Sequence, residues 1–256
     1  MAREILPINA DLLDRETPVR AIFLHGYACT SADWVPVADR LSPGRYLLVD
    51  FPGHGLLAQS RSSGFASLVE MTTSFLRQLP TPAIVVGHSM GGMVAMSIAS
   101  SHPELVRGLI LADAFPYLPA VTEAFGGPED AADPFGYGSV IDRQTPQDVQ
   151  TRVRASMATG VRTAGTELHA ELMTLDLRSR LSEIDVPTLA LVGDRHGAAG
   201  LSGRALTNAV GLAGLSNLSV QMVPSHHFIM LEQPLVVARY IEKFILGQEK
   251  TAKGKK

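Results

Sequence analysis

Ser89 is the residue whose surroundings point most directly to chemistry. It lies in the sequence G-H-S-M-G, residues 87–91, directly after the apolar run 83–86 and directly before a segment rich in Gly, Ala and Ser. A strand, a sharp turn and a helix in this order form a nucleophile elbow, which exposes the serine hydroxyl. Gly87 and Gly91 fit because strand and helix backbones approach closely there. The segment predicts a nucleophilic serine, although a helix start capped by Ser89 would use the same residues.

A serine hydroxyl is a poor nucleophile near neutral pH unless a positioned base removes its proton. Of the eight histidines, His227 fits this role best because it follows the last predicted strand, 218–223, and precedes the last predicted helix. The adjacent His226 is the alternative. Two adjacent histidines could also indicate a metal site, but neighbouring residues point apart and no carboxylate or cysteine motif accompanies them. We therefore expect a serine and histidine pair that works without a metal ion or another cofactor.

The elements that must position these residues alternate along the chain. Short apolar runs of strand length are interleaved with helix-like segments, and most of the runs have the composition of parallel strands buried on both faces. Such alternation implies right-handed crossovers and an α/β fold with a doubly wound sheet. The expected strands are 21–24, 46–51, 83–86, 108–111, 188–192 and 218–223, and the expected helices are 31–41, 65–79, 91–101, 204–212 and 235–246.

The alternation is interrupted between residues 114 and 183. A segment rich in Gly, Pro and aromatic residues is followed by two predicted helices, one starting at Thr145-Pro146 and one covering 166–175. We interpret 114–183 as a helical cap inserted into a sheet domain of residues 1–113 and 184–248. The apolar side chains of the cap favour an uncharged or hydrophobic acyl group as substrate: Phe115, Tyr117, Leu118, Phe125, Phe135, Tyr137, Met157, Leu172 and Met173.

Composition limits the partners. The chain has 256 residues, of which 46% are hydrophobic, and its formal net charge of −3 indicates no basic surface for nucleic acid or anionic membranes. The sequence has no basic and apolar leader and no apolar run of bilayer length, so we expect a soluble, cytoplasmic protein with a small-molecule partner. The single cysteine, Cys29, excludes an internal disulfide. Residues 249–256 are predicted to form a disordered basic tail.

Four motifs, in this order and spacing, resemble the α/β-hydrolase family. They are H-G-Y at 25–27, D-F-P-G-H-G at 50–55, G-H-S-M-G-G at 87–92 and S-H-H-F-I-M-L-E-Q-P at 225–234. The resemblance covers nearly the whole chain and implies a mostly parallel, eight-stranded sheet, a helical cap and a Ser, acid, His order. It also implies a serine esterase or a lipase-like activity without a cofactor. His227 stands five residues before Glu232, as in the family ending H-x-x-x-x-E-x-P.

The resemblance further implies an oxyanion hole made of two backbone N–H groups. By match to the family motifs, these belong to Tyr27 and Met90. Gly26 and His88 are expected beside the same site. His25 and His54 lie in family loop motifs, where we expect hydrogen bonds within the turns rather than chemistry.

The acid that should orient His227 is where the sequence departs from the family pattern. A carboxylate must accept a hydrogen bond from the second ring nitrogen of the base. The family usually carries it as G-x-x-D, but here the run G-D-R-H at 193–196 places His196 in that position. Asp194 lies two residues early, whereas Asp113 ends the preceding strand, from which haloalkane dehalogenases and cofactor-free dioxygenases of the family present their acid. Asp113 is favoured, Asp194 is the alternative, and a site without an acid stays open.

These residues predict a serine hydrolase that cleaves a small or medium apolar carboxylic ester, or a thioester, through an acyl-enzyme. Two alternatives stay open. In the first, His227 and Asp113 act as a base pair in a cofactor-free oxygenation or elimination, and Ser89 only binds substrate. In the second, the chain is a hydrolase-like ligand-binding protein with a weakened triad. The complete nucleophile elbow favours the hydrolase.

Overall fold

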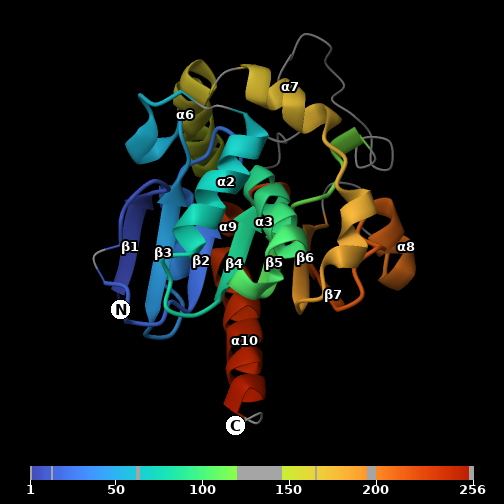
Figure 1. Cartoon of the computed structure of the whole chain (residues 1–256). Helices are drawn as coiled ribbons and strands as arrows, with labels where there is room; N and C mark the ends of the chain where they lie inside the picture. Colours follow the sequence, from blue (N-terminus) through green and yellow to red (C-terminus); the bar gives the residue numbers. More distant parts are fainter. Residues whose placement is uncertain are drawn as a thin grey trace.

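A seven-stranded sheet forms the central layer of the molecule (Figure 1). The computed structural model describes residues 2–12, 14–61, 64–119, 146–164, 166–194 and 200–253. The strand order is β1-β3-β2-β4-β5-β6-β7, and every neighbouring pair is parallel. The strands are β1 (Ala2–Pro7), β2 (Ala21–Leu24), β3 (Arg45–Asp50), β4 (Ala83–His88), β5 (Val106–Ala112), β6 (Thr188–Gly193) and β7 (Leu218–Val223).

The sheet confirms the predicted α/β class and the six predicted strands, with one difference at its edge. Seven strands are described, whereas eight were expected. The lateral edge of the sheet beside β3 is formed by β1 alone, because the described residues between β1 and β2 form turns and loops. The composition of β1 does not reveal it, since its sequence AREILP mixes charged and apolar residues and its side chains are partly exposed.

Helices cover both faces of the sheet (Figure 1). Side chains of α2, α3 and α8 belong to one hydrophobic core, and those of α1, α9 and α10 belong to the other. The helices are η1 (Ser31–Trp34), α1 (Val35–Ala38), η2 (Gly55–Leu57), α2 (Phe65–Leu76), α3 (Met90–Ser101), η3 (Pro103–Leu105), α6 (Gln147–Ala164), α7 (Thr166–Thr174), η4 (Arg178–Glu183), α8 (Gly203–Ala209), α9 (Ile229–Glu232) and α10 (Pro234–Lys253). In the described parts of the chain, no helix combines the length and the apolar character that a membrane crossing requires.

The two cores explain the continuous apolar runs of the central strands. Successive side chains of a strand point to opposite faces of the sheet. In β2, Ile22 and Leu24 enter the core beside α2 and α3, whereas Ala21 and Phe23 enter the core beside α1 and α10. Because both faces are covered, neither set of positions tolerates polar residues, and the strand reads as one apolar run.

Helices α6 and α7 lie beyond the carboxyl ends of the strands (Figure 1). Polar contacts join them to the loops and helices around the sheet. Arg152 of α6 donates to the buried Asp33 of η1, with 2.9 Å between Nε and Oδ1. Glu171 of α7 accepts the Phe65 N–H at the start of α2, with 2.7 Å between the nitrogen and Oε2.

Both helices fall within the predicted cap, 114–183, but the division of the chain into a sheet domain and a cap stays a prediction. Phe115 and Leu172 are buried in the core that contains α2 and α3. Phe125, Phe135 and Tyr137 lie outside the described residues.

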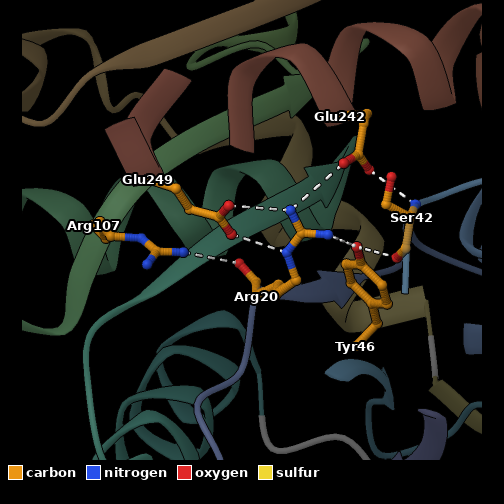
Figure 2. Close-up of polar contacts among 6 residues, drawn as sticks. All are labelled: Arg20, Ser42, Tyr46, Arg107, Glu242 and Glu249. Atoms are coloured by element: carbon orange, nitrogen blue, oxygen red, sulfur yellow. Dashed lines mark hydrogen bonds and ion pairs between the residues drawn. The ribbon is translucent and has the colours of Figure 1, made fainter. Parts of the chain in front are cut away.

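A polar cluster centred on Arg20 attaches α10 to the amino ends of the strands (Figure 2). The Arg20 guanidinium donates to both carboxylate oxygens of Glu249, at 2.9 and 3.3 Å, and to Oε1 of Glu242 at 3.5 Å. It also donates to the Tyr46 hydroxyl at 2.8 Å. The cluster is mostly buried, so these charge-assisted bonds fix α10 against the sheet.

Helix α10 therefore extends further than the sequence suggests. The helix continues to Lys253 and includes part of the segment 249–256, which was expected to be a disordered tail. Glu249 explains the difference, because its two bonds to Arg20 tie the last turns of the helix to the domain. Residues 254–256 lie outside the described residues.

Candidate active site

Ser89 lies in a strained turn between β4 and α3. Its φ is 49° and its ψ is −119°, a region that residues with a Cβ rarely adopt. Its N–H donates to the carbonyl of Ala112 at 3.3 Å, and its own carbonyl accepts the N–H of Gly92 at 2.9 Å. The side chain makes no capping bond to α3. The alternative in which the Ser89 hydroxyl is only a helix cap therefore does not describe this turn.

The glycines around Ser89 are required by close backbone approaches. A Cβ on Gly87 would collide with the carbonyl of Gly91. A Cβ on Gly91 would lie 2.5 Å from the carbonyl oxygen of Leu24, at the end of β2. The strand and the helix could not pack at this distance with larger residues, as the sequence motif predicts.

Asp113 and His227 form a hydrogen bond at the same edge of the sheet. The distance between Asp113 Oδ2 and His227 Nδ1 is 2.7 Å. Asp113 follows β5 with a φ of 46° and is 1% exposed. Its second carboxylate oxygen accepts the N–H of Gly193 at 2.9 Å, and its own N–H donates to the Leu191 carbonyl at 2.7 Å. Both neighbours belong to β6, so the adjacent strand holds the carboxylate in position.

Asp194, the other candidate acid, is placed differently. The N–H of Asp194 donates to the carbonyl of Val223 at 3.0 Å, and Asp194 is half-buried. No hydrogen bond joins its carboxylate to His227, although both residues are described. His196, in the usual family position of the acid, lies outside the described residues.

His226, the alternative base, faces a different carboxylate. Its Nδ1 lies 3.1 Å from Oε2 of Glu232, and its backbone N–H donates to the same oxygen at 3.1 Å. Both side chains are 3% exposed. Glu232 therefore holds the loop one residue before His227, whose ring is 16% exposed.

The buried histidines of the neighbouring loops each make one hydrogen bond within their own turn, as expected, and a second one that joins the two loops. His25 donates from Nδ1 to the next carbonyl at 2.8 Å and accepts the Phe51 N–H on Nε2 at 3.0 Å. His54 donates from Nδ1 to the Pro52 carbonyl at 2.9 Å and accepts the Ala28 N–H on Nε2 at 3.0 Å. Burial lowers the pKa of His25 to about 4 and that of His54 to about 3. Both rings are neutral near pH 7.

The loop after β2 brings Tyr27 close to Ser89, because Leu24 of β2 pairs with Gly87 of β4. Strand β3 lies on one side of β2 and strand β4 on the other, so the direction of the strand order reverses at β2. Parallel α/β sheets commonly bind ligands at the carboxyl ends of the strands where this reversal occurs. Met90 begins α3, so its N–H belongs to the first turn, which lacks intrahelical acceptors. The assignment of the Tyr27 and Met90 N–H groups to an oxyanion hole stays a prediction.

His169 of α7 is a residue that the sequence reading missed. No motif of the sequence includes this histidine, yet the residue is half-buried and its ring centroid lies 5.4 Å from that of Tyr27. On the other side, the Tyr27 ring lies 6.1 Å from the His54 ring. Burial raises the pKa of Tyr27. No local signal could identify this contact, because it depends on how α7 docks onto the sheet domain.

A cavity of about 250 Å³ lies beside His54, whose ring centroid is 6.1 Å from that of Tyr27. It opens between the loops after β2 and β3 and helix α6. Its walls are Cys29, Thr30, Gly53, His54, Gly55, Ala58, Ala155 and Ser156. Burial raises the pKa of the Cys29 thiol well above its usual range, so this wall is neutral near pH 7. Across the described parts of the chain, no group of three or more His, Cys, Asp and Glu side chains could hold a metal ion.

The buried histidines predict a pH-dependent stability. Burial also lowers the pKa of His88, to about 3. His25, His54 and His88 would each take up a proton at about pH 6.5 in the unfolded chain, but only well below that pH in the folded one. Their contribution to stability is present above about pH 6.5 and is lost as pH falls towards about 4 for His25 and about 3 for the other two. Each proton lowers the unfolding free energy by about 1.4 kcal/mol per pH unit.

Urea denaturation at about pH 7, 6 and 5 measures this slope. His54→Gln should reduce the slope by about one proton relative to the wild type. A wild-type unfolding free energy that stays constant over this range would contradict the prediction.

A doubly wound parallel sheet with a serine at a strained strand-to-helix turn is the arrangement of α/β hydrolases. The sequence pattern that defines the Alpha/beta hydrolase family matches residues 21–240, and the chain belongs to this family.

Among its relatives is the pimeloyl-[acyl-carrier protein] methyl ester esterase of Yersinia enterocolitica serotype O:8. It is 34% identical over 216 residues, which cover 73% of this chain and 79% of the relative. The protein of the same name from Yersinia pseudotuberculosis serotype IB is 30% identical over 245 residues, which cover 87% and 92%. A solved structure, a hydrolase from Oleispira antarctica, shares the fold with a TM-score of 0.71 and 14% identity, over 89% of this chain and 91% of that one.

Proposed function

We propose that this chain is a serine esterase that hydrolyses a small or medium apolar carboxylic ester through Ser89, His227 and Asp113. The observation that carries the proposal is the 2.7 Å contact between His227 Nδ1 and Asp113 Oδ2. With Nδ1–H donated to the carboxylate, Nε2 of His227 is the nitrogen that can accept a proton. The strained Ser89 turn and the relatives named as methyl ester esterases support the same activity.

In the proposed reaction, the Ser89 oxygen attacks the ester carbonyl while Nε2 of His227 takes the hydroxyl proton. The negative charge on the carbonyl oxygen is stabilised by the N–H groups of Tyr27 and Met90 and by the positive end of α3. His227 then gives its proton to the leaving alcohol, and an acyl-enzyme remains. Water, activated by His227, releases the acid and restores Ser89. Asp113 stabilises the imidazolium that forms in each step.

The proposed substrate is an ester with a small alcohol group and an acyl chain of modest length. The name of the relatives describes the methyl ester of an acyl chain on a carrier protein. The cavity of about 250 Å³ beside His54 offers room for such a chain. Its volume lies just below the usual range of ligand pockets, which favours a short or medium chain. A thioester would use the same residues.

A fluorophosphonate probe tests the nucleophile. We expect one adduct per chain on the peptide that contains Ser89, measured by intact mass and peptide mapping, and no adduct in Ser89→Ala. Hydrolysis of p-nitrophenyl esters should fall in the same variant to the background rate.

The same variants distinguish the alternatives. Turnover that survives Ser89→Ala would instead support base chemistry by His227 and Asp113 without a cofactor. A folded wild type that binds ester analogues tightly but forms neither adduct nor product would support a ligand-binding protein.

Asp113→Asn and Asp194→Asn test the acid. Replacing the equivalent aspartate of a serine protease lowers kcat by about 10⁴, because the base then adopts the wrong tautomer. We expect a loss of this order for Asp113→Asn and a change of less than about threefold for Asp194→Asn. Steady-state kinetics on one ester, with circular dichroism as the folding control, decides the assignment. Equal losses in the two variants would contradict it.

Ala155→Trp tests the acyl pocket. Ala155 is an exposed residue of α6 at the cavity wall, so tryptophan should fill the cavity without disturbing the core. We expect kcat/KM for p-nitrophenyl octanoate to fall by about tenfold or more relative to p-nitrophenyl acetate. Ala170→Trp, on the exposed surface of α7, is the matched control and should leave this ratio unchanged. A ratio that Ala155→Trp leaves unchanged would place the acyl chain elsewhere.

A further inference from the structure

We propose that His88 is a positioning residue for His227: its Nε2–H holds the backbone carbonyl of the base, and its ring supports the ring of the base without exchanging a proton. This inference rests on the proposed function, because it takes His227 as the base. It assigns a role to the second residue of the elbow, which contributes neither the nucleophile nor the expected oxyanion donor.

The hydrogen bond of His88 fixes its tautomer. Nε2 of His88 lies 3.0 Å from the backbone oxygen of His227. A carbonyl oxygen can only accept, so Nε2 must carry the proton and Nδ1 must carry a lone pair. This is the reverse of His25 and His54, which donate from Nδ1. His88 thus presents its proton toward the loop of the base.

The other nitrogen of His88 argues against a role in packing alone. Nδ1 is buried and has no hydrogen-bond partner among the described residues. A Cβ on Gly26 would lie 2.6 Å from this nitrogen, so the ring fills the space against the loop after β2. An unsatisfied buried acceptor costs about 1–3 kcal/mol, and an apolar side chain would fill the same space without this cost. The feature that an apolar side chain could not supply is the Nε2–H donor.

The ring of His88 also lies against the ring of the base. Their centroids are 4.6 Å apart with an interplanar angle of 46°, and the ring of Phe228 lies 5.7 Å from that of His88. The titratable groups that act on His88 are His227, Asp113 and His25. Burial, and then the proximity of His227, lowers the pKa of His88 to about 3. A neutral ring does not repel the imidazolium that forms on His227 during the reaction.

His88 completes a set of three contacts that fix the base. Asp113 holds the His227 ring through Nδ1, Glu232 accepts the N–H of His226, and His88 donates to the backbone carbonyl of His227 itself. His88 is also the residue directly before Ser89, so one backbone segment carries both the nucleophile and the support of the base. Loss of the third contact should let the loop rotate and weaken the bond between His227 and Asp113.

A matched pair of variants, His88→Gln and His88→Met, separates the donor from the shape. The two side chains have similar length, but only glutamine keeps an N–H at the position of Nε2. We expect His88→Met to lower kcat for a p-nitrophenyl ester by about 10- to 100-fold with a KM change below about threefold, and His88→Gln to stay within about fivefold of the wild type. Titration with the fluorophosphonate probe counts active sites, so an inactive fraction is not mistaken for a slower site.

The pH profile of kcat/KM supplies a readout that packing would not change. Its acidic limb reports the base in the free enzyme. A carboxylate partner favours the charged imidazolium, so a weaker Asp113 contact should move this limb to lower pH in His88→Met and leave it unmoved in His88→Gln. His88→Phe, which keeps a planar ring without the donor, replaces the methionine variant if the latter does not fold.

Equal loss of kcat in the glutamine and methionine variants would overturn the proposal, as would an acidic limb that does not move in the variants without a donor. The proposed function fails separately. A wild type without Ser89-dependent turnover would overturn both, whereas a wild type with such turnover and indistinguishable His88 variants would overturn only the role of His88.

Discussion

The hydrogen bond between Asp113 and His227 is the interaction on which the arrangement of the site depends. It joins the end of β5 to the loop after β7, and β6 lies between them. A parallel sheet brings the carboxyl ends of these strands to one edge, so residues more than a hundred positions apart can meet. The N–H of Gly193 in β6 binds the second oxygen of the carboxylate, and a larger residue at Gly193 would collide with the carbonyls of the loop that carries His227. Strand β6 therefore both holds the carboxylate and sets its distance from that loop.

Backbone strain is present at both the serine and the aspartate of the proposed triad. Ser89 and Asp113 each have a positive φ without being glycine, and each follows directly after a strand. Such conformations cost about 1–3 kcal/mol and persist where the surroundings fix them. The surroundings are visible in both cases, since Ser89 donates to the carbonyl of Ala112 and Asp113 donates to that of Leu191. The ladder of the sheet continues one residue beyond each strand and holds the strained residue in place.

Much of the fold could be predicted from the sequence because its signals are local. The elbow glycines and the apolar runs report the packing of their own segments, and the structure contains the expected strands. The strand β1 could not be predicted in this way, because an edge strand is stabilised by pairing with β3 rather than by its own composition. The choice between Asp113 and Asp194 depends on the register of β5 against β6 and on the direction of two side chains. The contact of His169 with Tyr27 depends on the docking of a helix.

The histidines show how one residue type takes different roles at a single edge. His25, His54 and His88 are fully enclosed, and burial keeps them neutral, so they act as rigid donors and acceptors of fixed tautomer. His227 differs in two respects: its ring is partly exposed, and its Nδ1 lies 2.7 Å from the carboxylate of Asp113, which the sheet itself holds. Under the proposed function, the partly exposed ring is the one that reaches the substrate, whereas the enclosed neutral rings only hold the backbone around it. Burial is the physical difference that separates the two roles.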